Sequence, residues 1–76
     1  MDTYKTKDIY EASALIAMKM RIVCLEKEGS VFWFVFDSTD ECAQIANDYW
    51  NGGLVISAKD YSDAIRSLKD RIFANK

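Results

Sequence analysis

The sequence predicts an α+β fold in which three helices pack on a small antiparallel sheet. One observation is a pair of short β-branched and aromatic runs joined by a turn sequence, which is typical of a β-hairpin. A second is three segments with helical spacing of apolar residues, each preceded by a residue that can cap a helix. The third is size. A chain of 76 residues, 50% of them apolar, suffices for a single domain over residues 1–76 and is not disordered.

The first helix is expected from Lys7 to about Lys19. Thr6 precedes it as the expected N-cap, and Asp8 and Glu11 fall in the first turn, where carboxylates interact favourably with the helix dipole. Apolar residues cover most of the circumference of this segment. We therefore expect this helix at the centre of the domain.

A hairpin follows, with strands at Ile22–Leu25 and Val31–Phe36 and a turn that uses Gly29 for a positive φ. Both faces of the second strand are apolar. One face carries Phe32, Phe34 and Phe36, and the other carries Val31, Trp33 and Val35. A half-solvated strand alternates apolar and polar residues, so either both faces are covered or one is an interaction surface.

The second helix is expected to begin after Ser38, because Ser38 and Glu41 fit a capping box, and to end near Trp50 before the stop signal Asn51–Gly53. Leu54–Ile56 is either a short third strand or an extended connector.

Ser57 and Asp60 have the spacing of an N-cap for the last helix, whose apolar residues recur at helical spacing from Tyr61 to Phe73. The expected order is helix, strand, strand, helix, an optional short strand, and helix.

The composition excludes several chemistries. Histidine is absent, so catalysis and metal binding by histidine are ruled out. Cys24 and Cys42 are too few for a zinc site and have no histidine base. Asp37, Asp40 and Glu41 form the densest carboxylate cluster, but calcium-loop spacing is missing and acids are common where a helix begins. We expect no catalytic residue, no metal site and no cofactor, and hence no enzyme.

The chain shows no targeting or spanning signal. Its charged beginning does not resemble a signal peptide, and its longest apolar runs, near residues 12–18 and 31–36, are too short to cross a bilayer. Two thiols that do not form a recognisable motif are typical of a reducing compartment. We expect a cytoplasmic protein that makes no contact with a membrane.

Two surfaces are candidates for binding a protein partner. The large apolar side chains that so short a chain can barely cover are Val31, Trp33 and Val35 on the hairpin and Tyr49 and Trp50 on the second helix. Trp and Tyr are enriched at protein–protein hot spots. The alternative is that the helices bury these side chains. A homodimer is the simplest association that would cover them.

The second surface is acidic. Residues 26–53 carry Lys27 against six carboxylates, a balance of −5. The candidate residues are Asp37, Asp40, Glu41 and Asp48. Such a patch would steer a basic partner, and the alternative is a solvated surface without a binding role.

The last helix carries the residues that would contact phosphates in a nucleic-acid complex: Arg66, Lys69 and Arg71. Asp63 and Asp70 are interspersed, and the formal net charge of −2 does not favour nucleic acid as a partner. A nucleic-acid-binding or transcription-accessory domain is therefore the alternative hypothesis.

Four short motifs resemble a family. They are Tyr4-x-Thr6-x-Asp8-Ile9-Tyr10 with Ala12, Phe34-Val35-Phe36-Asp37, Tyr49-Trp50-Asn51-Gly52, and Tyr61-x-x-Ala64-Ile65-x-x-Leu68-Lys69. Together they resemble a small stand-alone domain-of-unknown-function family of bacteria, phages and mobile elements, although Tyr61 stands where the pattern has phenylalanine. The resemblance implies a compact domain without known activity or site residues.

We therefore expect a non-enzymatic protein that acts through protein–protein interaction. A phage or mobile-element modulator or inhibitor of a host nucleic-acid-handling complex would fit the acidic middle segment, because such complexes present basic surfaces.

Overall fold

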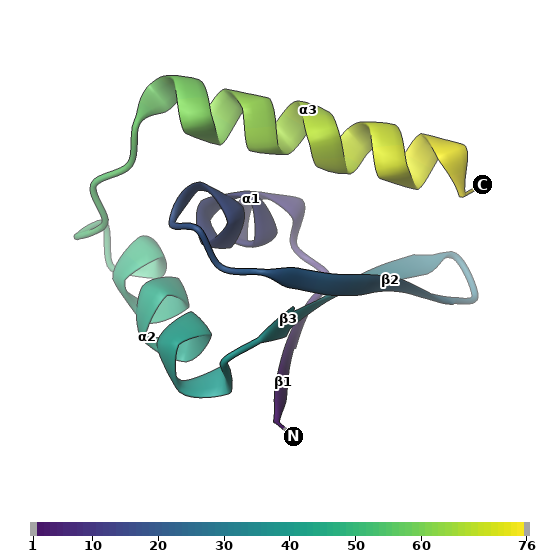
Figure 1. Ribbon diagram of the computed structural model, residues 1–76, viewed down its shortest axis with the longest axis horizontal. Helices are drawn as coiled ribbons and strands as arrows, with labels where there is room; N and C mark the ends of the chain where they lie inside the picture. Colours follow the sequence, from purple (N-terminus) through teal and green to yellow (C-terminus); the bar gives the residue numbers. More distant parts are fainter. Residues whose placement is uncertain (1, 76) are drawn as a thin grey trace.

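A computed structural model describes residues 2–75, so residues 1 and 76 of the predicted single domain lie outside the described residues. Within that range, three strands and three helices form an α+β fold (Figure 1). In chain order they are β1 (Thr3–Thr6), α1 (Ile9–Ala17), β2 (Ile22–Glu28), β3 (Val31–Asp37), α2 (Thr39–Trp50) and α3 (Ala58–Ala74). The predicted fold class is confirmed.

The sheet has the strand order β1-β3-β2, with β3 in the centre and antiparallel to both neighbours. The expected hairpin is β2 and β3, and Gly29 in its turn has a φ of 63°. The third strand is β1, where Tyr4 pairs with Phe36. The sequence does not predict this strand, because four residues are too few to show a clear alternation. Of the two alternatives for Leu54–Ile56, the extended connector is correct, because these residues lie outside any strand.

The core joins the central strand to all three helices. It consists of Ala12 and Leu15 from α1, Phe34 and Phe36 from β3, Cys42 from α2 and Leu68 from α3. Phe34 and Phe36 project to the same side because alternate residues of a strand share a face. In Figure 1, α1 lies between the sheet and α3, and both its core residues are fully buried. The expected central position of the first helix is confirmed.

The start of α1 corrects one expectation. Asp8, and not Thr6, is the N-cap, because its Oδ1 accepts hydrogen bonds of 2.9 Å from the backbone N–H groups of Tyr10 and Glu11. Thr6 is the last residue of β1, and its Oγ1 accepts from the backbone N–H of Asp8 at 3.2 Å. The helix also ends before the expected Lys19, whose φ of 70° is incompatible with an α-helix.

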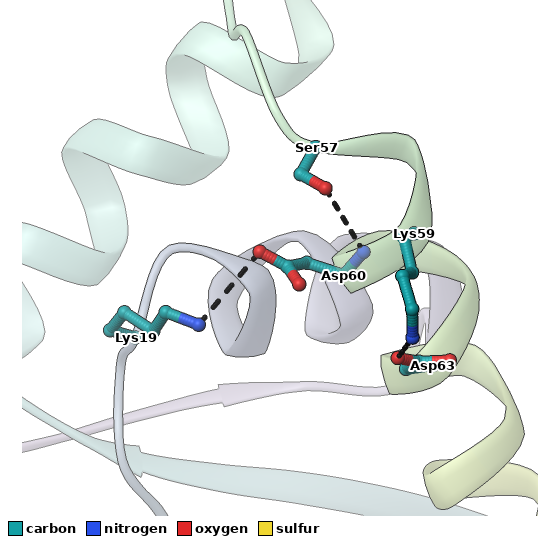
Figure 2. A network of polar contacts seen from close by, with 5 residues as sticks. All are labelled: Lys19, Ser57, Lys59, Asp60 and Asp63. Carbon is teal, nitrogen blue, oxygen red and sulfur yellow. Dashed lines mark hydrogen bonds and ion pairs between the residues drawn. The ribbon is translucent and has the colours of Figure 1, made fainter.

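The predicted capping box at the start of α2 is wrong. Ser38 is the N-cap, but its backbone is left-handed, with φ 63° and ψ 66°, and its side chain makes no capping hydrogen bond to a described residue. A capping side chain normally requires an extended N-cap backbone. Ser57, by contrast, caps α3 as predicted, since its Oγ accepts from the backbone N–H of Asp60 at 3.3 Å (Figure 2).

The first turn of α3 also contacts the turn that follows α1. Lys19 Nζ lies 3.9 Å from Asp60 Oδ2, and Lys59 Nζ donates to Asp63 Oδ2 at 2.9 Å (Figure 2). The Lys59 contact lowers the pKa of Asp63. Exposed pairs of this kind contribute little stability, so α3 is held mainly by buried side chains such as Leu68.

The helices are short, and α2 and α3 carry many polar and charged residues. The longest, α3, has 17 residues, and its exposed side is charged. None of the helices in the described part of the chain has the length and apolar character needed to cross a membrane.

Candidate functional site

The carboxylate of Glu11, in the first turn of α1, connects three elements. Glu11 is only 7% exposed. Its Oε2 accepts a hydrogen bond of 2.8 Å from the hydroxyl of Tyr4 on β1, and its Oε1 accepts one of 2.7 Å from the indole Nε1 of Trp50 on α2. A buried carboxylate is costly unless it is hydrogen-bonded. Here each oxygen has a donor, and the positive end of the α1 dipole is adjacent.

Trp50, at the end of α2, is exposed to solvent and is also held in place by its hydrogen bond to Glu11. The residue is 60% exposed, yet its polar Nε1–H group is occupied by Glu11. The ring of Tyr49 packs against it edge-on, with centroids 5.0 Å apart and planes at 78°. The indole thus presents apolar ring surface to solvent in a defined orientation. Aromatic surfaces of this kind are typical of binding sites.

Tyr4 is the partly buried partner in this network. Burial, assisted by the hydrogen bond to Glu11 and the charge of that carboxylate, raises the pKa of Tyr4 to about 12. The phenol therefore keeps its proton at neutral pH and continues to donate to Glu11. The network thus provides a fixed support for the indole of Trp50.

Tyr49 packs inward, between α2, the connector and α3. The pocket there has a volume of about 320 Å³ and is lined by Tyr49, Leu54, Ile56, Ala58 and Tyr61. The hydroxyls of Tyr49 and Tyr61 lie 3.4 Å apart, and Tyr61 donates to the backbone carbonyl of Tyr10 at 3.5 Å. Burial and the contact with Tyr49 raise the pKa of Tyr61. Tyr49 and Trp50, predicted together, thus have different surroundings.

Three of the four predicted acidic residues come together at the start of α2. A hollow of about 480 Å³, which we call the acidic hollow, is lined by Asp2, Asp37, Ser38, Thr39, Asp40 and Glu41. Asp37 is partly neutralised by Arg21, whose Nε lies 3.2 Å from Asp37 Oδ2. Asp48 lies further along α2 and accepts a hydrogen bond from Gln44. Among residues 2–75, no group of acidic or cysteine side chains is arranged to hold a metal ion.

The predicted hairpin surface, Val31, Trp33 and Val35, lies on the face of β3 that points away from the core. Lys5 of β1 opposes Val35, and Glu26 of β2 opposes Trp33, so both charged side chains share this face. Lys5 Nζ donates to Glu26 Oε1 at 2.9 Å across the central strand. This pairing raises the pKa of Lys5.

Charged side chains therefore cover much of the hairpin surface. Val35 is only 3% exposed, and Lys7 Nζ lies 6.0 Å from the ring centroid of Trp33. Val31, at the end of β3, is the most exposed of the three predicted residues, at 37%.

The two thiols differ in their environments. Cys42 is buried in the core and donates from Sγ to the backbone carbonyl of Asp37 at 3.2 Å. Burial, with smaller contributions from Glu41, Asp37 and Glu11, raises its pKa to about 11. Cys42 is therefore a protonated core side chain and not a nucleophile. Cys24 is a free, exposed thiol on β2.

The cations of α3 do not form a separate basic patch. Arg66, Lys69 and Arg71 are exposed, but Arg66 and Arg71 line one shallow hollow together with Asp63 and Asp70. Mixed charges of this kind do not produce the potential that attracts a phosphate backbone.

Sequence reasoning missed the role of Glu11. It assigned this residue to a favourable position in the helix dipole, which is correct but incomplete. The available signal was a carboxylate within a helix segment that is apolar on nearly all sides, since such a carboxylate must find donors when the helix is buried. The identities of the donors, Tyr4 and Trp50, depend on tertiary structure.

The fold and the Glu11 network define a small α+β domain with a three-stranded antiparallel sheet and an aromatic residue fixed at the end of α2. The chain belongs to the family described as Domain of unknown function (DUF5659), whose model matches residues 1–74. This confirms the resemblance to a domain-of-unknown-function family. No curated protein and no solved structure matches the chain.

Proposed function

We propose that this protein is a non-enzymatic binding domain that recognises a basic protein surface through α2. The observation that carries the proposal is the composition and placement of this helix. It contains three carboxylates and no lysine or arginine, and its last residue is the exposed, anchored Trp50. The exposed residues on one side of the helix, which we call the α2 surface, are Asp40, Ala43, Asn47 and Trp50.

Electrostatics and shape support this choice of surface. Asp40 belongs both to the α2 surface and to the acidic hollow, so the carboxylates of the hollow adjoin the helix face. Complementary charge steers partners during association, and a tryptophan can supply the hot spot. The hairpin surface supports an interface or a homodimer less well, because Val35 is buried and Lys7 covers part of Trp33.

The partner class that fits is a protein that handles nucleic acid, because such proteins present clusters of lysine and arginine. If the α2 surface bound such a cluster, it would block or alter the partner's contact with nucleic acid. The protein would then act as a modulator or inhibitor of the nucleic-acid-handling complex. A protein carried by a phage or mobile element, acting on its host, fits this role.

The test compares three immobilised proteins in a nuclease-treated lysate of the host cells: the wild type, Asp40→Lys with Glu41→Lys, and the matched control Glu28→Lys with Asp70→Lys. The control makes the same charge change at the last residue of β2, beside the hairpin turn, and in the C-terminal part of α3, at the other end of the molecule from α2 (Figure 1). We expect the wild type and the control to retain the same basic proteins and the α2 variant to lose them. Equal retention by all three would contradict the proposal, as would retardation of nucleic acid by the purified wild type in a low-salt gel shift.

A further inference from the structure

Trp33, Phe32 and Trp50 are aromatic side chains outside the core cluster. They differ in whether a lysine of the same chain lies over the ring. Lys7 Nζ lies 6.0 Å from the centroid of Trp33, and Lys27 Nζ lies 5.7 Å from the centroid of Phe32. Trp50 is 60% exposed, and none of the described lysines or arginines lies over its ring. Indole is the side chain that binds cations best through its π face.

We propose that Trp50 is a binding site for an arginine side chain of the partner, which stacks on the exposed indole while a second cation of the same segment pairs with Asp40. The inference rests on the proposed function and specifies its partner as an arginine-containing, extended or loop segment. Two further observations and one chemical argument carry it.

The first is that the indole is preorganised. Its Nε1–H donates to Glu11 Oε1 at 2.7 Å, and the ring of Tyr49 packs edge-on against the indole. An incoming group therefore meets a ring whose orientation needs little further ordering, which reduces the entropic cost of binding. Because the N–H is already used, the ring offers an incoming group its π surface and not a hydrogen bond.

The second is the geometry of the α2 surface. Asp40 and Trp50 are ten positions apart, which corresponds to about 15 Å along the helix axis and about 80° around it. An extended peptide covers that distance in about four to five residues. Two cations with that separation could contact both groups at once.

The third is the choice between arginine and lysine. The planar guanidinium stacks on an aromatic face and is more weakly hydrated than an ammonium group. The carboxylate at the other end accepts either cation. Specificity for arginine must therefore come from Trp50, and the contribution of Asp40 should be one of charge alone.

The test measures binding of fluorescently labelled hexa-arginine and hexalysine peptides by anisotropy at low and moderate salt. A hexapeptide reaches about 20 Å when extended, which is enough to span the α2 surface. The variants are Trp50→Leu and Trp50→Phe, with Trp33→Leu as the matched tryptophan control, and Asp40→Asn, with Asp70→Asn as the matched charge control. Circular dichroism establishes that each variant is folded.

We expect hexa-arginine to bind the wild type more tightly than hexalysine. Trp50→Leu should weaken hexa-arginine about three- to tenfold and abolish the preference for arginine, with Trp50→Phe intermediate. Asp40→Asn should weaken both peptides by about two- to fivefold, and the controls should bind as the wild type does. If Trp50→Leu has no effect while Asp40→Asn does, the arginine site is wrong and the acidic binding domain stands. If Asp70→Asn weakens binding as much as Asp40→Asn, or the wild type binds neither peptide, both proposals are wrong.

Discussion

The two tryptophans of this domain lie in contrasting surroundings. Trp33 is partly buried in the central strand, on a face crossed by the Lys5–Glu26 ion pair, with Lys7 near its ring. Trp50 stands at the end of an acidic helix, mostly exposed, with its N–H group bound to Glu11. The same residue type is thus covered in one region and presented in the other. The difference teaches that neighbouring charges, and not the size of the side chain alone, decide which aromatic ring can receive a partner.

The largest expected effect separates the two faces of β3. Phe34→Ala should lower the free energy of unfolding by about 3 to 5 kcal/mol, because it leaves a cavity in the core. Trp33→Ala, one position away on the other face, should cost about 1 to 2 kcal/mol, since its ring is only partly buried. Urea unfolding measures both. Equal losses would mean that Trp33 is also a core residue. The two tryptophans would then differ by core burial of Trp33, and not by the charged side chains around it.

The buried side of α2 should make the domain sensitive to alkaline pH. The pKa of Cys42 is raised from 9.0 to about 11 in the folded chain, so the folded state holds this proton more tightly than the unfolded state. Stability from this group is fully present below pH 9 and is lost as pH rises toward 11. The full loss is about 2 to 3 kcal/mol. Tyr4, whose pKa rises from 10.0 to about 12, adds a further loss above pH 10.

Urea unfolding at a series of pH values measures this decline, with Cys42→Ala as the control. The variant should be less stable overall but should show a flatter pH dependence between pH 9 and pH 10. A decline of equal steepness in both proteins would show that Cys42 is not its source.

A smaller effect is expected from the support beneath Trp50. Glu11→Gln keeps one acceptor oxygen but places an NH₂ group where a carboxylate oxygen faced a donor, so it should cost about 1 to 2 kcal/mol. Glu28→Gln, at the exposed end of β2 beside the hairpin turn, is the matched control and should leave the urea midpoint unchanged. A loss as small as that of the control would show that the Glu11 network contributes no stability.

The smallest effect is expected on the hairpin surface. Lys5→Gln removes the ion pair with Glu26, whose partners are both about half exposed. Such pairs contribute little and are screened by salt, so the urea midpoint should shift slightly at low salt and not at high salt. A large shift that persists in salt would mean that the pair is part of the packing above Val35.

Much of the fold was predictable because its signals are local. The hairpin shows period-two runs around a glycine turn, and the N-cap of α3 shows a serine at the correct spacing from Asp60. The β1 strand was not predictable, since four residues show little alternation and their pairing with β3 is set by tertiary contacts. Ser38 fits a capping box by spacing, but its left-handed backbone removes the side chain from the capping position.

The candidate site was predictable in part. The sequence singles out Trp50 by size and Asp37, Asp40 and Glu41 by charge, and the structure places the three acids around one hollow. It cannot show that Glu11 binds the indole N–H, because the two residues are 39 positions apart and meet only through the packing of α1 against α2. Nor can it distinguish the covered Trp33 from the exposed Trp50, since the covering lysine comes from beyond β1.

For Trp50 to serve as a preformed anchor, it must be both exposed and fixed. Time-resolved fluorescence of Trp33→Phe, in which Trp50 is the remaining tryptophan, measures both properties, through acrylamide quenching and anisotropy decay. We predict that Trp50 is quenched more efficiently than Trp33 in the matched Trp50→Phe protein, yet rotates only with the whole molecule, and that adding Glu11→Gln frees its motion. Quenching no stronger than that of Trp33, or free rotation of the indole in the presence of Glu11, would contradict the assignment of Trp50 as the binding anchor.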